Sequence, residues 1–179
     1  GQHGLMGKQN LYEHSTRIPL IAAGPGIPPG IRSTELVWHA DTAATILLAA
    51  GVDASAAAEG GDLRAVVSTQ HHEPLRQSFA MVHSESQRAI RSARWKLIRY
   101  QPNASPKFAM APEGRTSRGS DTEQLFDLES DPAETINRAS DPALSRIRDD
   151  LLRDLLAWQE RVGDPFAAAT RRALAEGAP

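Results

Sequence analysis

The sequence contains no cysteine, and aromatic residues make up only 5% of its 179 residues. Without thiols the chain can form no disulfide and offers no thiolate to a metal, which leaves the redox compartment undetermined. No apolar run approaches the roughly 20 residues that span a bilayer, so no membrane segment is predicted. The formal net charge is only −2. A balance this even gives no basic surface for nucleic acid.

What is present fits a globular chain with a real core, because 40% of the residues are hydrophobic and 23% are charged. The chemistry is concentrated in the first twenty residues, which hold His3, Lys8, Glu13, His14 and Arg17 among several glycines. Glycine permits tight turns and close approach to a ligand, and lysine is a compact charge that can bind an anion. On the residues alone, a surface loop with a solvated Lys8 is the commoner interpretation, and an anion-binding loop is the alternative.

This stretch resembles the sulfatase family, a branch of the alkaline phosphatase superfamily. The family pattern G-x-H-G-L-x-G-K, followed by Y-E-x-S-x-R-x-P-L, appears here as residues 3–8 and residues 12–20. In sulfatases this loop carries the lysine that touches the sulfate group. The resemblance therefore implies that Lys8 binds substrate and that His3 supports it.

The resemblance also indicates what lies elsewhere. Sulfatases carry a pair of metal ligands just upstream of this loop, and their nucleophile is a Cys or Ser converted to formylglycine nearer the N-terminus. This chain begins at Gly1 and contains no Cys. We therefore expect the C-terminal part of a sulfatase, with no metal ligand and no certain catalytic residue of its own, that is inactive alone.

The expected cofactors, calcium and formylglycine, would belong to the full-length parent protein. The expected partners are the missing N-terminal part and a sulfated small molecule or carbohydrate, with no nucleic acid and no membrane. The compartment is unknown, and would be periplasmic or secreted if the parent carries a signal peptide.

In the first half of the chain, the apolar residues 18–23 predict a short buried strand, bounded by a Gly-Pro-Gly turn. Asp41 is predicted to be the N-cap of a helix over residues 42–50, which Gly51 ends. Glu13 and Arg17 lie four residues apart and are interpreted as a structural ion pair. Two adjacent histidines followed by a glutamate, residues 71–73, are assigned to a solvated loop rather than a metal site.

In the second half, short strands are predicted at residues 79–82, 88–91, 95–100 and 124–128, because apolar and polar residues alternate or cluster there. Their Arg and Lys residues are interpreted as edge charges that favour solubility. Residues 102–122 are predicted to be a long surface loop. These strands and the turn after them resemble a second sulfatase block. Its matching residues are Arg88-Ala89-Ile90-Arg91, Trp95-Lys96-Leu97-Ile98, Leu125-Phe126-Asp127-Leu128, Asp131-Pro132-Ala133-Glu134, Asn137 and Ala139.

The longest predicted helix starts with Asp141 as N-cap and Pro142 at the first position, and ends at Gly163. An apolar stripe along it predicts that it covers a sheet. The stripe consists of Leu144, Ile147, Leu151, Leu155 and Trp158. A last short helix is predicted within residues 166–176.

The fold class that follows is α/β, becoming α+β in the second half. Residues 1–67 are assigned to the end of a mixed sulfatase-type sheet domain. Residues 68–179 are assigned to a small antiparallel four-stranded sheet packed against a C-terminal helix.

Three functions remain open at this stage. The first is part of a sulfatase that hydrolyses sulfate esters. The second is a phosphodiester or phosphonate hydrolase of the same superfamily. The third is a non-catalytic interaction module that uses its exposed strands and the helical stripe.

Overall fold

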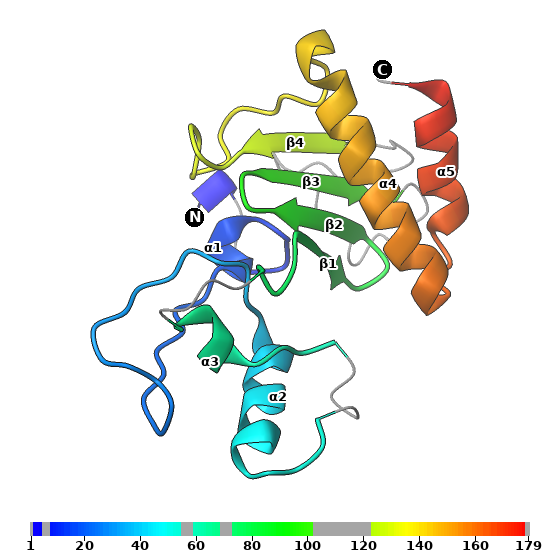
Figure 1. Ribbon diagram of the computed structural model, residues 1–179. Coiled ribbons are helices and arrows are strands. Elements are labelled where there is room, and N and C mark those ends of the chain that lie inside the picture. The colour runs from blue at the N-terminus through cyan, green and yellow to red at the C-terminus, as the bar shows by residue number, and fades with distance from the viewer. Residues whose placement is uncertain (1, 5–7, 55–58, 69–72, 102–122, 178–179) are drawn as a thin grey trace. The chain divides into compact units, whose positions relative to one another are not determined.

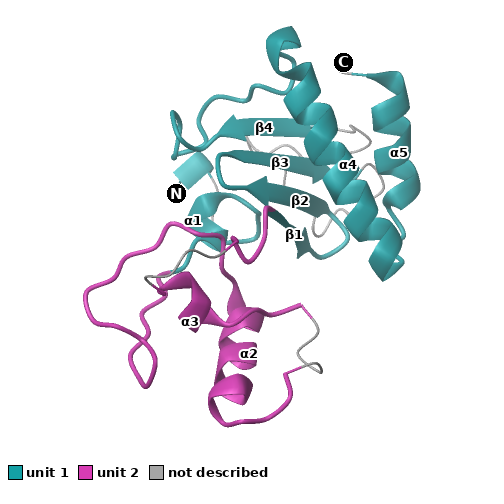
Figure 2. Cartoon of the chain, in the orientation of Figure 1, with its two compact units in different colours: residues 1–18, 78–179 teal, residues 19–77 magenta. Residues whose placement is uncertain are grey.

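The computed structural model describes residues 2–4, 8–54, 59–68, 73–101 and 123–177 (Figure 1). It divides the chain into two compact units (Figure 2). Residues 1–18 and 78–179 form the first, called here the sheet unit, and residues 19–77 form the second, the helical unit. Residues 1–18 thus group with the sheet. The assignment of 1–67 and 68–179 to two sulfatase domains stays a prediction.

The sheet unit is built on one four-stranded antiparallel sheet in the order β1-β2-β3-β4. Its strands are β1 (Ser78–His83), β2 (Gln87–Ser92), β3 (Trp95–Tyr100) and β4 (Glu123–Asp127). Each strand pairs with its neighbour in sequence, and the turn between β2 and β3 is short enough for a tight hairpin. The predicted four-stranded antiparallel sheet is confirmed.

One face of this sheet is covered by α4 (Ser145–Val162) and α5 (Ala167–Glu176) (Figure 1). The start of α4 is a short 3₁₀ turn, η4 (Pro142–Leu144), where the Asp141 side chain accepts the Ala143 N–H as predicted for a cap. Gly163 ends α4 in the left-handed conformation at φ 69°. The buried core between helices and sheet consists of Ile90, Leu97, Leu125, Ala139, Leu151, Leu152, Leu155 and Ala173.

The opposite face of the sheet is covered by the N-terminal segment, which includes η1 (Gln2–Gly4) and α1 (Glu13–Thr16). Leu11 and Tyr12 pack there in a second buried cluster with Ala89, Ile98, Tyr100 and Phe126. Strand side chains alternate between the two faces, so residues adjacent in sequence, such as Leu97 and Ile98, join different cores. The sheet is therefore a middle layer with the N-terminal segment fixed against it.

The helical unit contains α2 (His39–Ala49) and α3 (Leu63–Val66). Asp41 is fully buried, accepts the Trp38 N–H at 2.8 Å, and forms an ion pair with Arg76. The prediction of Asp41 as N-cap was wrong, because α2 begins two residues earlier and Asp41 completes a capping box as its third residue. Gly51, at φ 73°, follows the end of the helix as predicted.

The predicted buried strand over residues 18–23 was also wrong. The structure assigns no strand there, and Ile18, Leu20 and Ile21 are 51%, 47% and 93% exposed. A strand needs a neighbour for its backbone hydrogen bonds, and no described segment pairs with this one. The apolar pattern is present, but the surface that would bury it is not among the described residues.

The interpretation of the strand charges as edge protection was wrong as well. Arg88, Lys96 and Arg99 lie on the two interior strands and are at most 5% exposed. Each is neutralised by a carboxylate: Arg88 by Asp164 at 2.6 Å, Arg99 by Glu123, and Lys96 by the cluster described below. Buried charges are tolerated only when paired, so these residues are part of the core.

Candidate functional site

Lys8, the predicted sulfate-binding residue, lies in a bend and its side chain is exposed. The chain becomes buried two residues later, at Asn10, Leu11 and Tyr12. Leu11 donates its backbone N–H to Gln87 Oε1 of β2 at 3.1 Å. The lysine therefore stands just outside a point where the segment is fixed to the sheet.

The Asn10 side chain organises the turn that follows Lys8. Its Oδ1 accepts the Tyr12 N–H at 3.1 Å and the Ser15 hydroxyl at 2.9 Å. The Tyr12 N–H can only donate, so this contact fixes the orientation of the Asn10 amide. Asn10 Nδ2 then donates to His14 Nε2 at 3.2 Å. Three residues of the turn are held by one buried amide.

His14 is kept neutral by this arrangement. Because Nε2 accepts from Asn10, the ring proton sits on Nδ1, and a second proton on Nε2 would face the amide donor. Burial lowers the pKa of His14, and the nearby positive charges of Lys96 and Lys8 lower it further. His14 is thus an uncharged imidazole near neutral pH. These contacts give His14 a structural role in the turn.

His3, the second predicted substrate-binding residue, stacks on Tyr12 with ring centroids 4.0 Å apart and an angle of 6° between the planes. Its backbone is left-handed at φ 56°, an uncommon conformation outside glycine. Tyr12 is itself fixed, because its hydroxyl donates to Gln124 Oε1 of β4 at 2.8 Å. His3 Nε2 is buried and has no hydrogen-bond partner among the described residues. The structure thus brings His3 and His14 together around Tyr12.

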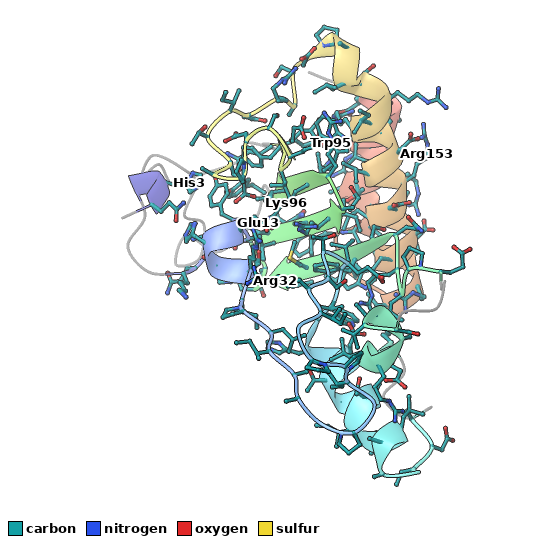
Figure 3. The ribbon with its side chains drawn as sticks, turned by 60° about the vertical axis from the view of Figure 1, so that its left-hand side comes forward. His3, Glu13, Arg32, Trp95, Lys96 and Arg153 are labelled. Carbon is teal, nitrogen blue, oxygen red and sulfur yellow. The ribbon has the colours of Figure 1, made fainter. Side chains whose placement is uncertain are left out.

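Behind this turn lies a group of four charges, called here the charge cluster: Lys96 and Glu134, which are buried, and Glu13 and Arg91, which are partly buried (Figure 3 labels Glu13 and Lys96). Lys96 Nζ is 3.1 Å from Glu13 Oε1 and 2.8 Å from Glu134 Oε1. Arg91 Nε is 3.2 Å from the same Glu13 oxygen. The Lys96 side chain is 0% exposed and that of Glu134 is 1%. The two positive charges of the cluster therefore balance its two negative charges.

The charge cluster sets the ionisation of Glu13. Burial by itself would raise its pKa, but the charges of Lys96 and Arg91 outweigh burial, and the pKa of Glu13 lies below its ordinary value. The predicted Glu13–Arg17 pair was wrong, since Glu13 turns to the sheet instead. Sequence spacing favoured the local partner because residues four apart meet on a helix, but α1 is a single turn.

Arg91, Lys96 and Glu134 were not recognised as members of one site from the sequence. The signal was present, because a charged residue at a core-facing position of an alternating strand needs a buried partner. Lys96 occupies such a position in β3, where its partners on the neighbouring strands are the buried Phe126 and the partly buried Arg91. The pairing itself spans up to 121 residues and cannot be read from spacing.

The described residues contain no group of three or more His, Cys, Asp or Glu side chains that could hold a metal ion. Of the His-His-Glu run considered above, residues 71 and 72 lie outside the described ranges. In the same part of the chain, no helix is both long enough and apolar enough to cross a membrane. The described residues by themselves therefore offer no ligand set that fits calcium.

Comparison with known proteins shows which family the chain resembles. The family model described as N-sulphoglucosamine sulphohydrolase, C-terminal, matches residues 1–110. The choline-sulfatase of Rhizobium meliloti (strain 1021) is 33% identical over 147 residues, covering 79% of this chain and 25% of that protein. Human arylsulfatase K is 30% identical over 149 residues, covering 77% of this chain and 25% of that protein. The chain spans about a quarter of the length of these curated relatives.

Solved structures share the fold. A 2-O GAG sulfatase superposes with a TM-score of 0.61 at 22% identity, covering 82% of this chain and 30% of that one. A protein solved in complex with its substrate D-glucosamine-2-N,6-O-disulfate superposes with a TM-score of 0.51 at 21% identity, covering 70% of this chain and 24% of that one. At these identities the likeness concerns the fold alone.

Fold and sequence together define the class as the C-terminal region of a sulfatase. More particularly, the chain belongs to the family described as N-sulphoglucosamine sulphohydrolase, C-terminal, and the resemblance drawn from its first twenty residues is confirmed.

Proposed function

We propose that this chain supplies the sulfate-recognition lysine, Lys8, of an enzyme that hydrolyses sulfate esters. The observation that carries the proposal is an exposed ammonium group on a segment that belongs to a sulfatase family and is fixed to the sheet directly behind it. A fixed cation beside a sulfuryl group stabilises the negative charge that develops as the ester bond breaks. In this proposal Lys8 binds and orients the sulfate.

His3 has a supporting role in the proposal. Its ring is held flat against Tyr12, and its Nε2 is buried without a partner among the described residues. A buried polar atom of this kind is costly unless something outside the described residues contacts it. A group of the parent protein, or the sulfate itself, would satisfy it.

The metal, the nucleophile and the rest of the active site are proposed to lie in polypeptide outside residues 1–179. The described residues hold no group that could bind a metal, and the exposed apolar residues 18–21 also support this proposal, since Ile21 is 93% exposed. Contiguous apolar surface in a soluble protein usually marks a contact with another element or partner. Calcium and formylglycine would then be supplied by the parent protein, and residues 1–179 alone would show no turnover.

The proposed substrate is a sulfate ester of a small molecule or carbohydrate. The similar proteins carry both kinds of name: one is a choline-sulfatase, and another was solved with a disulfated glucosamine. Sulfate is common to both, and the lysine recognises only this shared part.

The test is Lys8→Ala in a full-length gene product that contains this chain, with 4-nitrophenyl sulfate as substrate. Loss of a fixed cation of this type costs about 3 kcal/mol, so kcat/KM should fall about 100-fold. Gln9→Ala, a change at the exposed neighbour, is the matched control and should leave kcat/KM within two-fold of wild type, about 0.4 kcal/mol. Normal turnover by Lys8→Ala would remove Lys8 from the site. Preferential hydrolysis of bis(4-nitrophenyl) phosphate would favour the phosphodiesterase alternative.

A further inference from the structure

We propose that Glu13, Lys96 and Glu134 are positioning residues for Lys8: the charge cluster holds the turn that carries the lysine in one orientation on the sheet. The inference rests on the proposed function, because it concerns the same lysine. None of the three touches the sulfate in this scheme, and each acts through the backbone of residues 8–16.

The charge cluster joins parts of the chain that are remote in sequence. Glu13 lies in α1, Arg91 in β2, Lys96 in β3, and Glu134 in the turn after β4. The contacts of Glu13 with Arg91, Lys96 and Glu134 span 78, 83 and 121 residues. The N-terminal turn is therefore held in place by β2, by β3 and by the segment that follows β4.

Glu134 has the central part because it binds both the backbone and the charge of the turn. Its Oε2 accepts the Glu13 backbone N–H, while its Oε1 lies 2.8 Å from Lys96 Nζ. Lys96 in turn contacts the Glu13 carboxylate at 3.1 Å. Glu13 is thus held at its backbone by Glu134 and at its side chain by Lys96, and these two residues form an ion pair with each other.

The backbone of Glu134 supports a dedicated role. Its φ is +58°, a left-handed conformation that costs free energy in a residue with a side chain. Such a conformation persists only where surrounding contacts determine it. His3 and Glu134 share this left-handed conformation. Both contact the N-terminal turn, His3 at the Tyr12 ring and Glu134 at the Glu13 backbone N–H.

The distance from the anchored turn to Lys8 is short. Lys8 is three residues from Leu11, whose N–H is bonded to Gln87, so at most about 11 Å of extended chain separates their Cα atoms. A catalytic or binding group needs its support to be held within a fraction of an ångström. The bond of Leu11 to Gln87 fixes the end of the turn closer to Lys8, and the contacts of Glu13 with the charge cluster fix the end farther from it.

Apolar packing alone could keep the N-terminal turn against the sheet, but it would not fix the orientation of the turn. Buried and partly buried charges are not an efficient source of stability, because apolar replacements of equal volume often stabilise as well or better. What the charge cluster adds is direction, since hydrogen bonds and ion pairs fix the angle of the turn as well as its burial. This is why the charges are assigned to positioning.

The first experiment measures hydrogen exchange in the full-length gene product, comparing Glu134→Gln with the matched variant Glu123→Gln. Glu123 forms buried ion pairs in the same unit with Arg99 of β3 and, at 2.6 Å, with Arg148 of α4, and neither partner lies in the N-terminal turn. Glu134→Gln should speed exchange of the amides of residues 11–16 at least ten-fold, with β2 and β3 unchanged. Glu123→Gln should leave residues 11–16 as in wild type. Equal protection of residues 11–16 in Glu134→Gln and wild type would overturn the inference.

The second experiment tests whether Glu134 acts through Lys8, by a double-mutant cycle with 4-nitrophenyl sulfate. Glu134→Gln alone should lower kcat/KM about ten-fold, and should cause no further loss in a Lys8→Ala background. Equal losses in both backgrounds would mean that Glu134 serves only stability, and would overturn the inference. Normal turnover by Lys8→Ala would overturn the proposed function and this inference with it. Equal losses for Glu134→Gln in both backgrounds would overturn only the inference, so the two failures can be told apart.

A replacement variant covers the case in which Glu134→Gln does not accumulate as folded protein. Lys96→Arg keeps the positive charge but places a bulkier group where the side chain is 0% exposed, so it shifts the charge cluster without removing it. The same two outcomes decide: a loss that disappears in the Lys8→Ala background supports positioning, and an additive loss overturns it.

Discussion

Replacing Lys96 by methionine should destabilise the sheet unit by about 4 kcal/mol at pH 7. Methionine keeps most of the buried aliphatic stem of the 0% exposed side chain and removes only the ammonium. Glu13 would keep its ion pair with Arg91, and Glu134 would lose the cation at its Oε1. The perturbation therefore isolates the charge from the packing.

The magnitude follows from the contacts. At 3.1 and 2.8 Å from the two carboxylates, the ammonium has a gross attraction of about 5 to 6 kcal/mol to each, for an effective dielectric constant of about 20. Most of this offsets the cost of burying the charges, and removal of one partner from a buried pair costs about 3–5 kcal/mol. The loss is limited because an unpaired carboxylate can take up a proton. At pH 7 that costs about 1.4 kcal/mol for each unit above a pKa near 4.3, or about 3.7 kcal/mol.

The same reasoning fixes the sign of the pH dependence. In the wild type the pKa of Glu13 is lowered, with burial opposing and the Lys96 and Arg91 charges prevailing. Its contribution to stability is therefore present above the unfolded pKa and is lost as the pH falls through the folded pKa. In Lys96→Met the deficit should shrink by up to about 1.4 kcal/mol per pH unit between pH 7 and about pH 4.5, because protonation relieves the unpaired charge.

The assay is urea unfolding of wild type and variant at pH 7 and pH 4.5, followed by circular dichroism. Arg153→Gln is the control, because its ion pair with Asp150 is solvent-exposed at 61% and 60% and should be worth less than about 1 kcal/mol (Figure 3). A Lys96→Met deficit below about 1 kcal/mol at pH 7, or one that grows as the pH falls, would refute the assignment of Lys96 as a buried counter-ion.

Three other changes should have large effects for different physical reasons. Leu152→Ala removes a 0% exposed side chain from the core under α4 and should cost about 2–5 kcal/mol by urea unfolding. Gly60→Ala places a Cβ 2.2 Å from the Ala40 carbonyl oxygen, so the thermal midpoint of the helical unit should fall, whereas Gly51→Asn, where nothing lies within 4 Å, should be tolerated. Asp41→Asn removes the charge that Arg76 contacts at 2.7 Å and should lower the free energy of unfolding by about 2–3 kcal/mol. An unchanged unfolding midpoint would contradict the role of Asp41 as a buried counter-ion.

Much of the sheet unit could be predicted because its pattern is local. The alternation in residues 95–100 predicted the strand, and the stripe containing Leu151 and Leu155 predicted α4. The caps at Asp141 and Gly163 were also legible, since each acts within a few residues. Periodicity and capping need only neighbours in sequence, which is why these predictions are confirmed.

The failures share one cause, which is dependence on remote partners. Residues 18–23 have the composition of a buried strand, but no described segment pairs with them. Glu13 has a cation four residues away, yet it contacts Lys96, 83 residues away. A sequence gives the kind of group at each position, but not which distant group will meet it.

For this protein, the order of residues alone determined the sulfatase relationship, the four strands, the long amphipathic helix and the identity of Lys8 as the lysine to test. Only the tertiary structure decided that Glu13, Lys96 and Glu134 come together, and that charges on interior strands belong to the core. The physical reason is that helices and strands follow from short-range backbone geometry, whereas the partner of a buried charge is chosen by how the whole chain closes on itself.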